Sequence, residues 1–198
     1  TGARVQKELP DCTVLDGCIY VSASLEHPGV LVQHGPILRV VFGPRDPSYI
    51  SPILSSIQSD LCESGIDGVL STHIQRDALE KFSYVSPIGA AGVYLHAVAG
   101  DFQKEGAARE LFKSMIREIS TLAAAMGYPF EKDYVKINLE ILSNLSADAT
   151  TSMQRDIMEG KPSELDGLVM EPLRLAKKYS VSMPCYEEVA NALCPLEF

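Results

Sequence analysis

The chain has 198 residues, of which 46% are hydrophobic, and a formal net charge of −9 that comes from 26 acidic and 17 basic residues. This length and apolar content allow a sizeable core in one or two domains, and the acidic balance argues against a broad nucleic-acid-binding surface. No run of about 18 uncharged apolar residues occurs, which argues against a membrane span.

The five cysteines and four histidines are scattered along the chain, without a C-x-x-C pair. This arrangement lacks zinc-site spacing, so we expect no metal site, and it favours reduced thiols in the cytoplasm. The chain begins Thr1-Gly2-Ala3-Arg4, without an initiating methionine or a leader pattern, so we expect a fragment of a longer protein.

The first part of the sequence is rich in β-forming residues. Its apolar runs are Cys18–Leu25, Val30–His34 and Ile37–Phe42, separated by His27-Pro28-Gly29 and Gly35-Pro36. Such runs with Pro/Gly breaks predict an antiparallel meander.

After the meander the apolar spacing changes to that of a helix. Asp46-Pro47 is typical of a helix start, and an apolar stripe extends to Gly65 through Ile50, Ile53, Leu54, Ile57 and Leu61. Residues 69–74 could form one further short strand.

From about Gln75 the pattern is helical. Leu111, Met115, Ile119, Leu122 and Met126 recur at helical spacing before Gly127 and Pro129, and Asp133 is placed to cap the next helix. We expect a further helix from Ser163 to Tyr179 that Pro172 kinks, and a last helix that begins at Pro184. The fold class is therefore α+β, with a β-rich part over residues 1–74 and an all-helical domain over residues 75–198.

The most specific motif is a composite run near the C-terminus. Thr151-Ser152-Met153-Gln154-Arg155-Asp156-Ile157, Gly160-Lys161-Pro162 and Ser163-Glu164-Leu165-Asp166 follow closely upon one another. The run resembles the C-terminal domain of ketopantoate reductases (2-dehydropantoate 2-reductases), whose pattern is Ser-Met-x-x-Asp-(Ile/Leu), a Gly-containing turn, then (Thr/Ser)-Glu-(Ile/Leu)-Asp. Helix capping by Ser163 and Asp166, with Glu164 at the positive end of the helix, is the alternative explanation of its second half.

A second region, Leu79-Glu80-Lys81-Phe82, resembles the Trp-x-Lys-Leu helix of the same family. The resemblance implies that Lys81 is the general acid and that Glu164 and Ser152 contact the substrate. Glu164 would also help to keep Lys81 charged if the two approach each other. Residues 1–74 would then be the last part of a nucleotide-binding domain.

The chain departs from the family where the substrate is held. Val85, Gly89, Ala99 and Ala149 stand where the family carries asparagines, so the amides that would orient a substrate are missing. The hydroxyls of Tyr84 and Ser86 are candidates to compensate. The chemical machinery thus looks retained while the substrate pocket looks altered.

No G-x-G-x-x-G follows a strand and opens a helix in this sequence, and Gly89-Ala90-Ala91-Gly92 is better explained by close helix packing. We therefore expect NADPH to be the hydride donor of the intact parent and to bind this fragment poorly. By resemblance, the reaction is reduction of ketopantoate to pantoate, in the pathway to pantothenate and coenzyme A.

Two alternatives remain open: reduction of another small 2-oxoacid, and a non-catalytic binding or dimerisation module. The resemblance also leaves a homodimer as an option for the helical domain.

Overall fold

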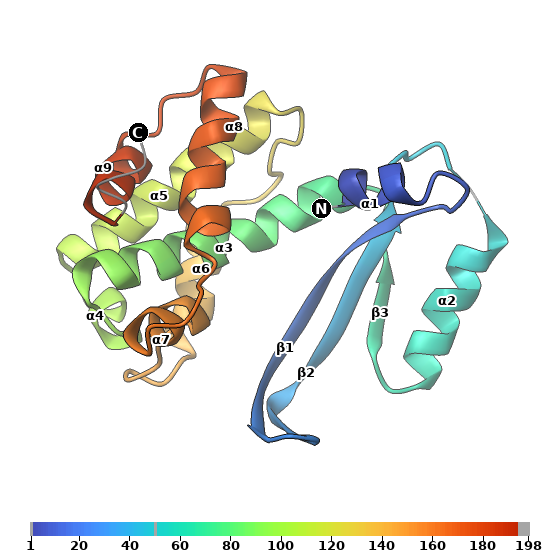
Figure 1. Cartoon of the computed structure of the whole chain (residues 1–198), viewed down its shortest axis with the longest axis horizontal. Coiled ribbons are helices and arrows are strands. Elements are labelled where there is room, and N and C mark those ends of the chain that lie inside the picture. The colour runs from blue at the N-terminus through green and yellow to red at the C-terminus, as the bar shows by residue number, and fades with distance from the viewer. Residues whose placement is uncertain (1, 50, 194–198) are drawn as a thin grey trace. The chain divides into compact units, whose positions relative to one another are not determined.

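The structure, a computed structural model, describes residues 2–49 and 51–193. The chain divides into two compact units, Thr1–Ala78 and Leu79–Phe198. The first unit combines a three-stranded sheet with helices and the second is helical (Figure 1), which confirms the α+β class expected from the sequence. The elements of the first unit are α1 (Gly2–Glu8), β1 (Leu15–His27), β2 (Val30–Pro44), α2 (Pro52–Glu63) and β3 (Asp67–Leu70).

The sheet has the strand order β1-β2-β3, with β1 antiparallel to β2 and β2 parallel to β3. The predicted strand end at Gly35-Pro36 is wrong, because β2 continues through it. The pairing passes from Val21 opposite Leu38 to Ala23 opposite Gln33, so residues 34–37 lie opposite Ser22 alone. Gly35 and Pro36 therefore form a bulge, with Gly35 in the left-handed region at φ 84°, and not a turn.

The two faces of this sheet pack against different helices. Cys18 and Val41 form a small buried cluster with Ile74 at the start of the following helix. Gly68 lies against α2, where an added Cβ atom would be 2.8 Å from Cβ of Leu61, and its carbonyl accepts a hydrogen bond from Gln58 at 3.1 Å. A glycine at this position lets α2 approach β3 closely.

Helix α2 begins at Pro52 and not at Asp46-Pro47. The carboxylate of Asp46 accepts hydrogen bonds from the backbone N–H of Ser48 at 2.9 Å and from its hydroxyl at 2.6 Å. Asp46 therefore closes a turn ahead of the helix, which is the other common use of this side chain. Leu54 of the predicted stripe is buried, whereas Ile50 lies outside the described residues.

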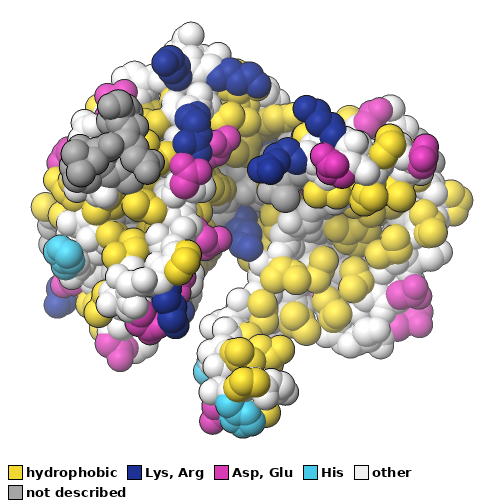
Figure 2. Space-filling view, viewed as in Figure 1, with side chains coloured by type: hydrophobic (Ala, Val, Ile, Leu, Met, Phe, Trp, Pro, Cys, Tyr) yellow, Lys and Arg dark blue, Asp and Glu magenta, His cyan; other side chains and the backbone are white. Residues whose placement is uncertain are grey.

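The distal part of the β1–β2 hairpin exposes apolar side chains. Leu25 and Leu31 lie opposite each other and are 63% and 75% exposed. Figure 2 shows hydrophobic side chains over the strands of this unit. This hairpin is a two-stranded ribbon whose far end adds little to the core.

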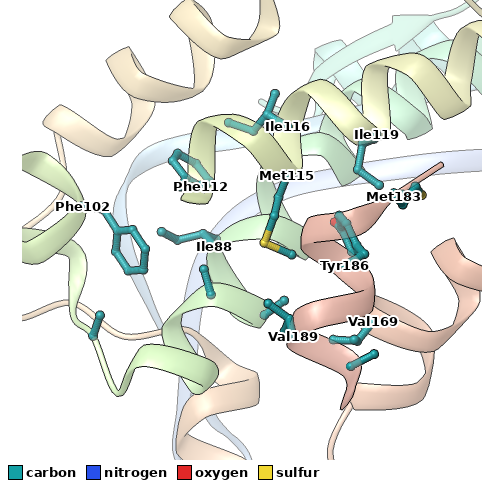
Figure 3. Close-up of a cluster of buried hydrophobic side chains, with 14 of the residues drawn as sticks. Ile88, Phe102, Phe112, Met115, Ile116, Ile119, Val169, Met183, Tyr186 and Val189 are labelled. Carbon is teal, nitrogen blue, oxygen red and sulfur yellow. The ribbon is translucent and has the colours of Figure 1, made fainter. Parts of the chain in front are cut away.

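Helix α5 lies at the centre of the second unit, where α4, α6, α8 and α9 pack against it. The elements of this unit are α3, which begins in the first unit (Ile74–Leu95), α4 (Ala99–Gln103), α5 (Ala107–Ala125), α6 (Tyr134–Ser143), α7 (Ser152–Met158), the π-helical segment η1 (Asp166–Met170), α8 (Glu171–Tyr179) and α9 (Pro184–Leu193). Phe112, Met115 and Ile119 of α5 are fully buried (Figure 3). The predicted cap at Asp133 is confirmed by its bonds to the N–H groups of Val135 and Lys136.

Within the part of the chain that is described, no helix is both long enough and apolar enough to span a bilayer.

Candidate active site

Lys81 lies on α3, where its side chain is half-buried. Val85 and Gly89 follow it at intervals of one helical turn, so the three positions share one face of the helix. We call this side of α3 the Lys81 face. The residues that pack against this face would surround a molecule bound beside Lys81.

A proline inside α3 is accommodated by a buried asparagine from another helix. Pro87 has no N–H to donate to the carbonyl of Ser83, four residues earlier. Nδ2 of Asn138, on α6, donates to that carbonyl at 3.0 Å and also to the Ser83 hydroxyl at 3.0 Å. Asn138 is 1% exposed, so the bond is made in the core. Helix α6 thereby fixes α3 two residues from Lys81.

A second proline is accommodated in the same way. Pro172, in the first turn of α8, cannot donate to the carbonyl of Leu168. The hydroxyl of Ser86, on α3, donates to that carbonyl at 2.6 Å, and it also bonds the hydroxyl of the buried Tyr186. Burial raises the pKa of Tyr186 well above its usual range, so this phenol stays neutral. The helix expected from Ser163 to Tyr179 with a kink at Pro172 is present from Leu165 to Tyr179, and its irregularity is the π-helical segment η1 directly before α8 and Pro172.

The start of α7 packs closely on α3. A Cβ atom added to Gly89 would lie 3.1 Å from Cε of Met153 and 3.9 Å from both Oγ1 of Thr151 and Cδ1 of Leu168. A Cβ atom added to Gly92 would lie 2.8 Å from Cδ of Gln154. The predicted role of Gly89–Gly92 in close helix packing is confirmed.

Gln154 holds this contact in place from the α7 side. Its Nε2 donates to the carbonyl of Ala97 at 2.8 Å, and its Oε1 accepts the N–H of Thr151 at 2.9 Å. The hydroxyl of Thr151 in turn accepts the N–H of Gln154 at 3.3 Å. This reciprocal capping box orients the first turn of α7.

The other two predicted site residues lie next to the groups that meet Gly89. Ser152 is the first residue of α7 and is exposed, directly after Thr151. Glu164 is exposed at the start of the turn that contains Leu168, whose N–H donates to the Glu164 carbonyl at 2.9 Å. The structure therefore brings the segments that carry Ser152 and Glu164 to the Lys81 face. Convergence of the three functional groups themselves stays a prediction.

Two of the four positions that lack the family's asparagine are joined through their backbones. The N–H of Ala99 donates to the carbonyl of Ala149 at 2.9 Å, and the N–H of Gly100 donates to the carbonyl of Ala147 at 2.7 Å. Ala149 packs on the core cluster of this unit. These positions fix the loop before α7 to the start of α4.

The hydroxyls of Tyr84 and Ser86 do not replace the missing amides. Ser86 is fully buried and already bonded to Leu168 and Tyr186. The Tyr84 hydroxyl is buried without a hydrogen-bond partner among the described residues, and its ring meets the Phe112 ring edge-on. Burial raises the pKa of Tyr84 to about 12. Neither hydroxyl is placed to hold a substrate.

The capping alternative for Ser163 and Asp166 is not what the structure contains. The carboxylate of Asp166 accepts two hydrogen bonds from the Arg174 guanidinium, at 2.9 and 2.8 Å. These bonds lower the pKa of Asp166. The helical residues begin at Leu165, so Ser163 is not the N-cap and Asp166 lies before the N3 position that a capping box requires.

Among residues 2–49 and 51–193, no group of His, Cys, Asp and Glu is arranged to hold a metal ion. Cys12, Cys18, Cys62 and Cys185 are free thiols.

Comparison with known proteins places the chain in a family. Residues 73–197 match the model "Ketopantoate reductase PanE/ApbA C terminal". The chain belongs to the ketopantoate reductase family and contains its C-terminal domain.

Relatives share this fold at low sequence identity. A 2-dehydropantoate 2-reductase from Nostoc sp. is 22% identical over 191 residues, covering 92% of this chain and 59% of that protein. The crystal structure of 2-dehydropantoate 2-reductase from Methylococcus capsulatus superposes with a TM-score of 0.82 at 22% identity, over 94% of this chain and 59% of that one. The ternary structure of D-mandelate dehydrogenase with NADH and anilino(oxo)acetate gives a TM-score of 0.78 at 18% identity, over 94% and 62% of the two chains. The chain thus spans about three fifths of the relatives that it matches.

Proposed function

We propose that this chain is the substrate side of an NADPH-dependent reductase that acts on the C2 carbonyl of a 2-oxoacid. The main support for the proposal is the packing of other segments against Gly89 of α3. There the Lys81 face meets Thr151 and Leu168, the neighbours of Ser152 and Glu164. Lys81 is about 12 Å from Gly89 along the axis, at about 1.5 Å per residue.

In the proposed reaction Lys81 is the general acid. Negative charge develops on the carbonyl oxygen as C2 is reduced, and an ammonium group beside that oxygen stabilises the charge and donates the proton. Glu164 would contact a substrate hydroxyl and favour the charged form of Lys81. Ser152 would donate a hydrogen bond to the substrate carboxylate or hydroxyl.

The candidate glycines among the described residues do not form a nucleotide-binding loop. Gly89 and Gly92, the candidates for a glycine-rich loop, lie inside α3 under Met153 and Gln154 and cannot cradle a pyrophosphate. NADPH, when bound to the intact protein, supplies the hydride. The relatives extend beyond the length of this chain, which supports placing the nucleotide site outside these residues.

Ketopantoate is the first substrate to test, with pantoate as product in the pathway to pantothenate and coenzyme A, and the cytoplasm is the proposed compartment. A different small 2-oxoacid is the second candidate. Val85 and Gly89 favour it, because neither position supplies a polar group to the Lys81 face. The D-mandelate dehydrogenase relative shows that this fold accompanies more than one 2-hydroxyacid activity.

The test is NADPH oxidation by the full-length protein that carries this chain, with ketopantoate and a panel of 2-oxoacids. We expect oxidation that depends on a 2-oxoacid. Ser152→Ala and Glu164→Gln should each lower kcat/KM by about tenfold to a hundredfold, since a hydrogen bond to a charged group contributes about 1.5–3 kcal/mol. The matched controls Ser143→Ala and Glu140→Gln, at exposed positions of α6, should leave it unchanged. Absence of turnover with every 2-oxoacid would favour the non-catalytic module.

A further inference from the structure

We infer that Tyr134 and Asn138 of α6 are positioning residues for Lys81, and that together they fix the turn of α3 that carries it. The inference rests on the proposed function, in which Lys81 is the general acid. It concerns the rate of the chemical step and not the choice of substrate.

The first observation is where α6 contacts α3. Tyr134 and Asn138 lie four residues apart, so their side chains share one face of α6. The Tyr134 hydroxyl donates to Oε2 of Glu80, the residue before Lys81. Nδ2 of Asn138 donates to the carbonyl and to the hydroxyl of Ser83, both at 3.0 Å. Helix α6 therefore holds α3 on both sides of Lys81.

The second observation is that this turn of α3 lacks a backbone hydrogen bond of its own. Pro87 leaves the Ser83 carbonyl without a donor from the next turn, and Asn138 supplies that donor from another helix. The Ser83 hydroxyl donates to the carbonyl of Glu80 at 2.7 Å, which links the two points that α6 holds. The turn thus depends on α6 for a contact that an uninterrupted helix makes within itself.

The third observation is that α6 is itself firmly placed. Asp133 caps its first turn through the N–H groups of Val135 and Lys136. The Tyr134 ring packs on the core cluster of this unit, with its centroid 4.9 Å from that of the Phe130 ring. A general acid must lie within hydrogen-bond reach of the atom that it protonates, and a displacement of about 1 Å can slow a reaction about a hundredfold. A rigid support under Lys81 therefore serves the chemical step.

Tyr134→Phe tests the inference with the loss of a single hydroxyl, because the ring that packs on the core remains. Single-turnover oxidation of NADPH by the full-length protein, at saturating 2-oxoacid, measures the chemical step apart from binding and product release. We expect the variant to be slower by about tenfold, while KM and NADPH affinity stay unchanged.

Tyr94→Phe is the matched control. The Tyr94 hydroxyl, near the other end of α3, donates to Oε1 of Glu188 at 2.9 Å, so this variant loses a bond of the same kind away from Lys81. It should oxidise NADPH at the wild-type rate.

Asn138→Leu should slow the chemical step by about tenfold or more, and adding Pro87→Ala should restore most of the rate, because residue 87 can then donate to the Ser83 carbonyl. Thermal unfolding establishes that each variant is folded at the assay temperature, so that lost stability does not explain a lost rate. A wild-type rate in folded Tyr134→Phe or in folded Asn138→Leu would overturn the inference and leave the proposed reductase function intact. Failure of the wild type to reduce any 2-oxoacid would instead refute the proposed function, and the inference with it.

Discussion

Asn138 performs a task that a backbone N–H performs in an ordinary helix. It donates to the Ser83 carbonyl that Pro87 leaves without a partner, and it does so in a dry environment. An unsatisfied carbonyl in such a place costs about 1–3 kcal/mol. This asparagine therefore stabilises the unit by preventing that loss, close to Lys81.

We predict that Asn138→Leu lowers the free energy of unfolding by about 1–3 kcal/mol. The penalty should shrink when Pro87→Ala is also present, because residue 87 then has an N–H for the Ser83 carbonyl. Urea unfolding of the four proteins of this double-mutant cycle measures the coupling directly. Strictly additive effects would show that the two residues do not act on the same carbonyl.

Tyr84 is the opposite case, a buried hydroxyl without a hydrogen bond in the described structure. Its folded pKa of about 12 exceeds the ordinary tyrosine value of about 10, so the folded state holds the proton more tightly than the unfolded chain does. Stability from this group is complete below about pH 10 and is lost as the pH rises towards 12.

We predict that Tyr84→Phe is at least as stable as the wild type at pH 8, because it removes a polar group that lacks a partner. Between about pH 10 and 12 the variant should lose less stability than the wild type. Denaturant unfolding at several pH values measures both effects, and Tyr186 contributes a similar slope in both proteins. A variant that is clearly less stable at pH 8 would indicate that the hydroxyl has a partner after all.

At the scale of the elements, the contact between α3 and α7 depends on glycine. An added Cβ atom at Gly92 would collide with Gln154, whose hydrogen bonds to Ala97 and Thr151 orient α7. We predict that Gly92→Ala destabilises the unit by about 1–3 kcal/mol, as overpacking does in other cores.

Gly167 provides the matched control, since it also lies in a helical segment but has open space around it. Gly167→Ala should be neutral or stabilising by up to about 1 kcal/mol. Thermal unfolding of the two variants separates the effects. Equal stability of the two would contradict the close contact at Gly92.

The element predictions succeeded where one local signal decides the outcome. The stripe of α5, the cap at Asp133 and the start of α9 at Pro184 follow from spacing and capping alone. They failed where pairing decides, as at Gly35-Pro36, where the partner strand β1 carries the chain past a sequence that signals a turn. The irregularity predicted at Pro172 is present, but its π-helical form has no local signal, because the Leu168 carbonyl accepts its hydrogen bond from Ser86, 82 residues away along the chain.

At the candidate site, too, the sequence did not reveal the roles that long-range contacts decide. Motif resemblance selected Lys81, Ser152 and Glu164, and the family match supports the choice of the C-terminal domain. Asn138 and Gln154, which hold the supporting helices, were missed. Asn138 lies in a helical stretch without a motif and Gln154 occupies a variable position of the family pattern, so only the distant carbonyls of Ser83 and Ala97 explain their roles. A proline inside a helix near a candidate residue is the sequence signal that could have prompted the search.

At the scale of the whole molecule, the chain carries the family's C-terminal domain and about three fifths of the length of its relatives. Under the proposed function, this part of the protein supplies the acid and the substrate contacts, and the nucleotide binds elsewhere in the intact protein. Assembly as a homodimer stays a prediction.

The central claim is that Lys81 donates the proton, and substitution of this residue in the full-length protein tests it most directly. The measurement compares kcat/KM for the best 2-oxoacid with NADPH affinity in Lys81→Ala, alongside Lys136→Ala at an exposed position of α6. We predict that Lys81→Ala lowers kcat/KM by about 10²–10⁴-fold while NADPH affinity stays unchanged, and that Lys136→Ala changes neither. An equal loss of turnover and NADPH binding in Lys81→Ala would contradict it.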